Sequence, residues 1–183
     1  MRIIGGLYKS RVLAEFAGDD VRPTSDRARE ALFNILSMKV ALARVLDLFS
    51  GSGALGLESL SRGAREVVFK DKSNDSVAIL KKNMKTLKIE DGKEAKVYNL
   101  DAEVYLDYAK EPFDIIFIDP PYALDGGVRA VEKIAKKSLL SENGVLVFER
   151  DKPFEGEVDG LEKYDERKYG KAILTFFRVA TKE

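Results

Sequence analysis

Short apolar runs and amphipathic segments alternate through the middle of the chain, from residue 44 to residue 149. The apolar runs are rich in branched and aromatic residues, which is typical of buried strands. The segments between them repeat their apolar residues at helical spacing. Such alternation predicts an α/β fold with a doubly wound, mostly parallel sheet and right-handed crossovers. The expected strands cover residues 45–49, 66–70, 95–99, 113–118 and 144–149, and the expected helices cover 53–62, 74–87, a short stretch ending near 108, and 128–139.

The pattern changes after Pro153. Residues 161–169 and 172–179 lie on either side of Gly170, and they predict a closing antiparallel hairpin. No internal repeat, low-complexity stretch or linker interrupts the sequence. We therefore expect residues 1–183 to form a single domain, with a core over 23–183 and an amino-terminal arm over 1–22.

The amino-terminal arm is expected to be a strand pair or an extended segment, with Gly5-Gly6 as a turn or bulge signal. Pro23 then precedes a helix whose apolar residues follow the spacing of one buried face. Thr24, Ser25 and Asp26 are all suitable N-caps for this helix, and the sequence does not choose among them.

The chain has no cysteine and no histidine, which limits the chemistry that its side chains can perform. Disulfides, thiolate chemistry and histidine acid–base catalysis are thereby excluded. Histidine is also the commonest transition-metal ligand, so we expect no metal site. Any catalysis must use carboxylates, Lys, Tyr, Ser, Thr or a bound cofactor.

Lys and Arg together number 31, and Asp and Glu also number 31, so the net charge is zero. A chain with this balance does not bind nucleic acid through bulk charge, and any RNA binding must use a local patch. No apolar run approaches the ~20 residues of a membrane span. The first residues also lack the apolar stretch of a signal peptide. We expect a cytoplasmic protein.

Three clusters of basic residues are candidates for contacting an anionic partner. One of them begins the first helix, where the helix dipole makes cations unfavourable, and this conflict suggests an anion nearby. For each cluster, ordinary solvated surface stays open as the alternative. The clusters are Arg2, Lys9 and Arg11; Arg22, Arg27 and Arg29; and Arg167, Lys168 and Lys171.

A glycine-rich turn follows the first core strand. Its glycines at 51, 53 and 56 fit the G-x-G-x-x-G pattern, which alone is weak evidence for a nucleotide-type ligand. Asp47 lies at the end of the preceding strand, where its carboxylate would repel a pyrophosphate and favour a cationic ligand. S-adenosylmethionine carries both a sulfonium and an ammonium group. The alternative is a carboxylate that only accepts hydrogen bonds from turn amides.

Further aspartates follow the next strands. Asp71 lies 20 residues after Gly51, a position from which a carboxylate can accept hydrogen bonds from the hydroxyls of a ribose. Asp101 could accept a hydrogen bond from an adenine amine or cap the next helix, and these roles are compatible. With Asp47 and Asp119, four successive strand ends carry aspartate, and we expect all four on the carboxyl edge of one sheet.

The stretch FDIIFIDPPY, residues 113–122, joins a buried strand to a rigid corner. Pro120 and Pro121 cannot continue a central strand, because they lack backbone N–H groups. Asp119 and the Pro120 carbonyl could accept hydrogen bonds from an exocyclic amine, and the Tyr122 ring could stack on a base. The alternative is a stiff turn in which Tyr122 only packs.

With these positions together, the sequence resembles the class I S-adenosylmethionine-dependent methyltransferases. More closely, it resembles the bacterial 16S rRNA guanine-N2 methyltransferases of the RsmD type. The glycine loop and DPPY are shared by many amino-methyltransferases, whereas the block RPTSDRAREALFNIL, residues 22–36, is far more specific. The resemblance covers nearly the whole chain and is carried by MRIIGG with Lys9 and Arg11, RPTSDRAREALFNIL, LDLFSGSGALGLESLSRGA, FIDPPY and Tyr169-Gly170.

This resemblance implies a seven-stranded sheet with a reversed hairpin at its end. It implies methyl transfer from S-adenosylmethionine to the N2 amine of one guanine in 16S rRNA. The implied substrate is a protein-bound 30S assembly intermediate, which would fit the neutral charge, and we expect a monomer.

The resemblance also assigns site residues. It implies that Asp47 and the glycine loop bind the methionine end of the cofactor, that Asp71 binds the ribose, and that Asp101 binds the adenine. Residues 119–122 would bind the target base. The complete candidate set is Asp47, Ser50, Gly51, Gly53, Asp71, Asp101 and Ala102 for the cofactor; Asp119, Pro120, Pro121 and Tyr122 for catalysis; and Arg2, Lys9, Arg11, Arg22 and Lys168 for the RNA.

The chain departs from the family pattern at a few positions. Ser10 occupies a place where glycine is expected, and Asp71 stands where glutamate is common. Lys70, directly before it, is unusual. A shorter carboxylate could still reach the ribose, so these departures affect details and not the class.

Other readings of the same sequence make different predictions. An NAD-type oxidoreductase lacks a histidine for hydride chemistry and leaves Asp47 unexplained. A non-catalytic RNA-binding module would need a vestigial cofactor pocket. Among methyltransferases, amines of adenine or cytosine and a protein glutamine are rival substrates.

Overall fold

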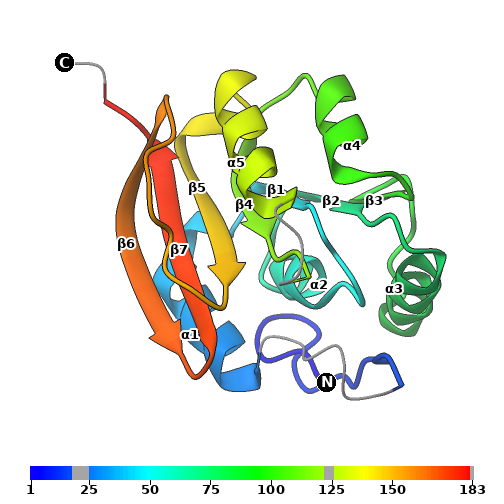
Figure 1. Ribbon diagram of the computed structural model, residues 1–183. Helices are drawn as coiled ribbons and strands as arrows, with labels where there is room; N and C mark the ends of the chain where they lie inside the picture. Colours follow the sequence, from blue (N-terminus) through cyan, green and yellow to red (C-terminus); the bar gives the residue numbers. More distant parts are fainter. Residues whose placement is uncertain (18–24, 122–125, 182–183) are drawn as a thin grey trace.

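The core of the protein is a single mixed sheet (Figure 1), in a computed structural model that describes residues 1–17, 25–121 and 126–181. Within these residues, seven strands lie in the order β3-β2-β1-β4-β5-β7-β6. The first five are parallel, and β7 runs antiparallel to both of its neighbours. The strands are β1 Arg44–Asp47, β2 Glu66–Lys70, β3 Ala95–Tyr98, β4 Phe113–Ile118, β5 Leu140–Arg150, β6 Leu161–Tyr169 and β7 Ala172–Val179.

Helices cover both faces of this sheet, as the sequence predicts. One apolar core joins α1, α2, α3 and part of the amino-terminal arm to the sheet, and a second joins α4 and α5 to the opposite face. None of the helices in the described part of the chain is long and apolar enough to cross a membrane. The helices are α1 Asp26–Leu36, the 3₁₀ turn η1 Ser37–Lys39, α2 Ala54–Ser61, α3 Asn74–Leu87, α4 Ala102–Tyr108 and α5 Gly126–Lys136.

The predicted elements are confirmed, with differences at their ends. Ser25 proves to be the N-cap of α1, because its hydroxyl accepts a hydrogen bond from the Ala28 N–H at 3.1 Å. The largest difference precedes β5, where the prediction of a helix to residue 139 and a strand from 144 is wrong. Helix α5 ends at Lys136, Ser138 has a left-handed φ of 53°, and β5 begins at Leu140. Residues 141–143 are polar, so the start of this strand has no apolar signature.

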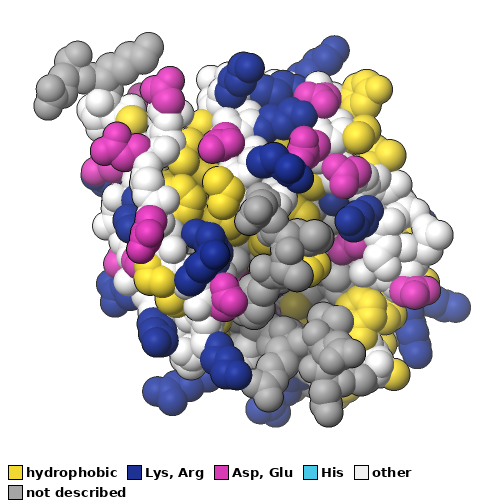
Figure 2. Space-filling view, in the orientation of Figure 1, with side chains coloured by type: hydrophobic (Ala, Val, Ile, Leu, Met, Phe, Trp, Pro, Cys, Tyr) yellow, Lys and Arg dark blue, Asp and Glu magenta, His cyan; other side chains and the backbone are white. Residues whose placement is uncertain are grey.

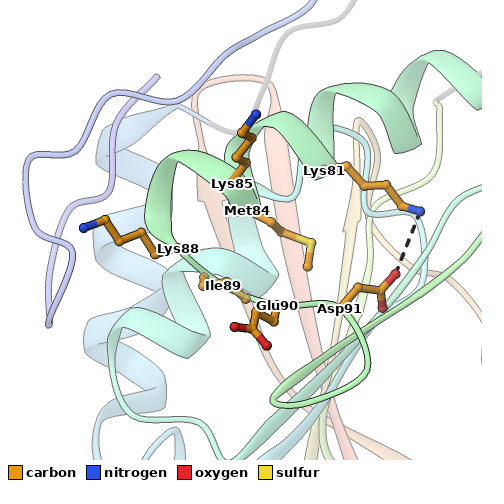
Figure 3. Close-up of a pocket in the computed structure, with 7 residues that line it drawn as sticks. All are labelled: Lys81, Met84, Lys85, Lys88, Ile89, Glu90 and Asp91. Carbon is orange, nitrogen blue, oxygen red and sulfur yellow. Dashed lines mark ion pairs between the residues drawn. The ribbon is translucent and has the colours of Figure 1, made fainter.

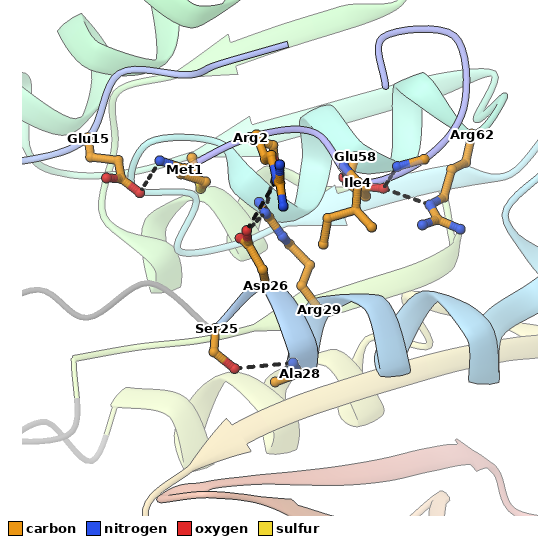
Figure 4. Close-up of polar contacts among 11 residues, drawn as sticks. Met1, Arg2, Ile4, Glu15, Ser25, Asp26, Ala28, Arg29, Glu58 and Arg62 are labelled. Atoms are coloured by element: carbon orange, nitrogen blue, oxygen red, sulfur yellow. Dashed lines mark hydrogen bonds and ion pairs between the residues drawn. The ribbon is translucent and has the colours of Figure 1, made fainter. Parts of the chain in front are cut away.

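The amino-terminal arm is held by a buried glutamate of α2 (Figure 4). Glu58 is fully buried, and its two carboxylate oxygens accept the N–H groups of Ile4 at 2.9 Å and Gly5 at 2.8 Å. The Arg62 guanidinium contacts the same carboxylate at 2.8 Å. The expected strand pair is reduced to one isolated antiparallel bridge between Arg2 and Val12. Side chains of the helices, with Glu58 joined by Ser61 and Asn83, hold the backbone of the arm through hydrogen bonds in addition to this bridge.

Ser10 has a left-handed backbone in this arm, with φ at 68°, and its side chain is exposed. This conformation costs an L-residue about 1–2 kcal/mol. Glycine removes that strain but also adds freedom to the unfolded chain. We therefore expect Ser10→Gly to raise the free energy of unfolding by about 0.5–1 kcal/mol in denaturant titrations.

Lys9→Gly provides the matched control for this prediction. Lys9 is also exposed, but its φ is not positive, so glycine adds only unfolded-state freedom and should lower stability. Equal losses in the two variants would contradict the assignment of strain to Ser10.

Candidate active site

The four predicted aspartates lie at the ends of four adjacent strands. Asp47 is the last residue of β1, Asp71 follows β2 directly, and Asp119 follows β4 directly. Asp101 comes just after β3, as the N-cap of α4. Because β3, β2, β1 and β4 are parallel neighbours, these ends share the carboxyl edge of the sheet, which is where open α/β sheets bind ligands.

The glycine turn between β1 and α2 is tied to the end of β2. Gly51 and Gly53 both have left-handed backbones, with φ of 53° and 86°, a conformation that glycine adopts without strain. The Gly51 N–H donates to Asp71 Oδ2 at 2.9 Å, and the Ser50 N–H donates to the Lys70 carbonyl at 3.0 Å. The turn is therefore already formed by contacts within the protein.

Asp47 is buried beneath this turn, with 2 % of its surface exposed. Its Oδ2 accepts a hydrogen bond from the Gly56 N–H in α2 at 3.0 Å. Burial raises the pKa of Asp47 to about 7; the Gly56 hydrogen bond opposes this rise, and the negative charge of Asp71 adds to it. The hydrogen bond to a backbone amide is the one expected of a structural carboxylate. The raised pKa means that this amide offsets only part of the cost of burying the charge.

Asp71 and Asp101 both accept backbone hydrogen bonds. Asp71 Oδ1 accepts the Ser73 N–H at 2.8 Å, while its Oδ2 holds Gly51. Asp101 Oδ1 accepts the Glu103 N–H at 2.9 Å and so caps α4, and Ala102 behind it is buried. Each carboxylate oxygen has two lone pairs, so both residues keep the capacity to accept hydrogen bonds from a ligand.

The D-P-P corner lies beside a second acidic residue. Asp119 is partly buried, Pro120 is buried and Pro121 is exposed. The register pairs Ile118 of β4 with Phe148 of β5, so the residues that follow them, Asp119 and Glu149, are neighbours along this edge. Glu149 is only 5 % exposed. The sequence indicates it as a site residue only by placing a charged residue directly after an apolar strand run. Tyr122 lies outside the described residues.

The predicted RNA-contacting residues are spread over the surface. Lys9 and Arg11 are exposed in the arm, and Arg2 is exposed close to Asp26, with Nε 3.7 Å from Oδ2. Lys168 of β6 is exposed. It pairs with Ile173 of β7, which also pairs with Arg150 at the carboxyl end of β5, so Lys168 lies at the carboxyl edge of the sheet. Figure 2 shows Lys and Arg intermixed with acidic side chains on the face in view. Arg22 lies outside the described residues.

Arg29 is a correction to the expected basic cluster at the start of α1. Its side chain is fully buried, and its Nη2 donates to the Arg2 carbonyl at 2.6 Å and to Asp26 Oδ1 at 2.8 Å (Figure 4). Burial lowers the pKa of Arg29, while the negative charges of Glu58, Asp26 and Glu15 oppose this shift. Arg29 therefore supports the arm and does not present its charge to a partner.

A surface hollow of about 390 Å³ lies elsewhere, at the carboxyl end of α3 (Figure 3). Lysines surround it, and Met84 and Ile89 contribute its apolar wall. Its lining includes none of the predicted site residues, so we assign it no part in the site. Across residues 1–17, 25–121 and 126–181, no group of three or more His, Cys, Asp or Glu side chains could hold a metal ion.

The residues of the glycine turn fit an adenosine-type cofactor with a charged methionine end. The Ser50 hydroxyl is buried, and it has no hydrogen-bond partner among the described residues. Buried hydroxyls are almost always hydrogen-bonded, so a ligand bound at this turn would supply a partner that the described residues do not. Among the described residues, only the Phe16 ring would lie near a Cβ on Gly51, at 3.9 Å, so no described side chain fills the space beside this backbone.

Comparisons with known proteins find similar sequences and structures along nearly the whole chain. A family model described as "Conserved hypothetical protein 95" matches residues 1–178. Ribosomal RNA small subunit methyltransferase D of Haemophilus influenzae is 37% identical over 160 residues, which cover 84% of this chain and 81% of that protein. Its namesake in Escherichia coli (strain K12) is 38% identical over 159 residues, covering 87% and 76%. The solved structure of a hypothetical protein from Thermus thermophilus is 33% identical, with a TM-score of 0.83 over 98% of this chain and 99% of that one.

Proposed function

The chain belongs to the Conserved hypothetical protein 95 family, and from this premise we propose that it is an S-adenosylmethionine-dependent rRNA methyltransferase. Its substrate is the exocyclic N2 amine of one guanine in 16S rRNA. The proposal is supported by relatives of the same length range that are named ribosomal RNA small subunit methyltransferase D. The observation that carries it is the row of aspartates along one sheet edge, at 47, 71, 101 and 119, around a preformed glycine turn.

Each part of this edge has a separate task in cofactor binding. The carboxylate of Asp47 faces the positive methionine end, together with the backbone of Ser50, Gly51 and Gly53. Asp71 accepts hydrogen bonds from the ribose hydroxyls, and Asp101 with Ala102 lies against the adenine. When bound there, S-adenosylmethionine supplies an electrophilic methyl group. The oxidoreductase alternative would bring the anionic pyrophosphate of its cofactor near Asp47, whose carboxylate would repel it.

The D-P-P corner holds the target amine. The lone pair of a guanine amine is delocalised into the ring, so the amine is a weak nucleophile. Hydrogen bonds from the amine to Asp119 and to the Pro120 carbonyl orient it, and orientation is the main source of rate enhancement in this step. Asp119 accepts the proton that the amine loses. The stacking role of Tyr122 stays a prediction.

The substrate is a protein-bound 30S assembly intermediate, on which the protein acts as a monomer in the cytoplasm. A chain with zero net charge gains little from bulk attraction to bare RNA. Exposed residues of the arm and of β6, namely Arg2, Lys9, Arg11 and Lys168, supply local contacts to phosphates, and Arg22 belongs to the same predicted set.

Deleting the gene from its host tests the proposal. Mass spectrometry of digested small-subunit rRNA should show the loss of one N2-methylguanine, and a plasmid copy of the gene should restore it. Loss of a methylated adenine or cytosine would transfer the assignment to another base. An unchanged methylation map would remove the assignment to rRNA.

A further inference from the structure

A buried lysine lies in the cofactor site without an assigned role. Lys70, the last residue of β2, is 1 % exposed, and its Nζ lies 5.0 Å from the centroid of the Phe49 ring. Within residues 1–17, 25–121 and 126–181, this ammonium makes no hydrogen bond or ion pair. Burying a charge without hydrogen bonds is costly, so its position requires an explanation.

The surroundings of Lys70 are the residues predicted to bind the adenosyl group. It directly precedes Asp71, the predicted ribose ligand, and pairs with Tyr98 at the end of β3. Burial lowers the pKa of Lys70 to about 8; the negative charges of Asp71 and Asp101 oppose this shift, and the positive charge of Lys72 adds to it. The ammonium therefore interacts electrostatically with both the carboxylate assigned to the ribose and the one assigned to the adenine.

Ser50 supplies a second, independent sign of a missing ligand at this place. Its buried hydroxyl is also without a partner in the described part of the chain, and its N–H donates to the Lys70 carbonyl at 3.0 Å. The buried Ser50 hydroxyl and the ammonium of the largely buried Lys70 thus both lack a hydrogen-bond partner among the described residues. Buried polar groups in folded proteins are almost always hydrogen-bonded, so a ligand that reaches both is expected here.

We propose that Lys70 is a further cofactor-binding residue, whose ammonium donates a hydrogen bond to an acceptor of the adenosyl group, either a ring nitrogen or a ribose oxygen. This inference rests on the proposed function. Adenosine offers several such acceptors, and a charged donor gives a stronger hydrogen bond than a neutral one. The Phe49 ring and the carboxylates of Asp71 and Asp101 hold the ammonium in place until the ligand enters.

Calorimetric titration with S-adenosylhomocysteine and with 5′-methylthioadenosine tests this role. The second ligand has no amino-acid end, so it reports on the adenosyl contact alone. At pH 7, Lys70→Met should weaken both ligands by about tenfold or more, the range expected for a charged hydrogen bond. Lys72→Met removes the same charge from an exposed neighbour and should change either affinity by less than about twofold.

The pH dependence gives a second readout. The protonated amine is the form that binds, so wild-type affinity for 5′-methylthioadenosine should fall as pH rises from 7 to 9.5. Lys70→Met should lack this fall. Asp47 also titrates near pH 7 but is present in both proteins, so its contribution cancels in the comparison. Thermal unfolding should show the methionine variant to be at least as stable as wild type, because it removes a buried charge.

The outcomes separate this inference from the proposed function. Equal affinity and an equal pH profile in wild type and Lys70→Met would overturn the role of Lys70 while leaving the methyltransferase proposal intact. A wild-type protein that does not bind S-adenosylhomocysteine would remove the proposal itself. If the methionine variant does not fold, Lys70→Gln takes its place, since it also removes the ammonium and should abolish the pH dependence.

Discussion

Asp119→Asn is expected to lower the rate of methyl transfer by about 100- to 10,000-fold, the range for losing a positioned proton acceptor. Asparagine keeps the size of the side chain but cannot accept a proton, and its amide presents a donor where the target amine needs an acceptor. Affinity for S-adenosylhomocysteine should change by no more than a few-fold, because the predicted cofactor residues lie at and beyond the ends of β1, β2 and β3 and not at the end of β4. Single-turnover transfer of a labelled methyl group to 30S particles from the deletion strain measures the rate.

The matched control for this variant is Asp159→Asn. Asp159 is exposed in the loop before β6, so the substitution makes the same change of charge away from the site. It should retain full activity. Undiminished transfer by Asp119→Asn would remove Asp119 from the chemical step, and a parallel loss of cofactor affinity would show instead that the variant disturbs the whole edge.

The order of strands and helices could be predicted because each signal is local. In the run from Phe113 to Ile118 every apolar residue is buried, as its composition predicts, and only Asp114 is partly exposed. The third glycine of the turn has a local reason as well, because a Cβ on Gly56 would lie 2.2 Å from the Phe69 ring. Such close packing of helix on strand is what the spacing of the glycines indicates.

The contacts that hold the arm could not be predicted, because their partners are distant in sequence. Glu58 falls within the apolar stretch that becomes α2, and nothing nearby in the sequence indicates that the backbone of Ile4 and Gly5 will surround it. Arg29 looks like one of several arginines at the start of a helix. Only the folded arm, which supplies the Arg2 carbonyl, turns its guanidinium inward.

The site shows the same division between local and distant signals. Strand phase predicts that Asp47, Asp71 and Asp119 share an edge, since residues after parallel strands must meet there. It does not predict that Asp71 already holds the glycine turn through the Gly51 N–H. Nor does it show that Lys70 is buried, because a lysine at a strand end ordinarily extends its ammonium into solvent.

Asp47→Asn is expected to stabilise the protein without its cofactor while weakening cofactor binding. The pKa of Asp47 is about 7 in the folded protein against an ordinary value of 3.8. A folded-state pKa above the unfolded one means that the contribution of Asp47 to wild-type stability is largest below about pH 4 and is lost as pH rises through 7. The interval corresponds to up to about 4 kcal/mol at pH 8, because each pKa unit is equivalent to about 1.4 kcal/mol. Asparagine does not ionise, and its carbonyl can still accept the Gly56 N–H.

Urea unfolding between pH 4 and pH 8 measures this effect. The difference in unfolding free energy between Asp47→Asn and wild type should be near zero at pH 4 and should grow in favour of the variant up to about pH 7. Asp159→Asn should show no such trend. In the same proteins, affinity for S-adenosylmethionine at pH 8 should fall by about tenfold or more for Asp47→Asn, because a buried carboxylate facing a cation has been neutralised. The prediction assumes that a buried carboxylate that destabilises the fold is retained for what it binds. A variant that gains stability but keeps full affinity would therefore show that the charge of Asp47 does not serve the ligand.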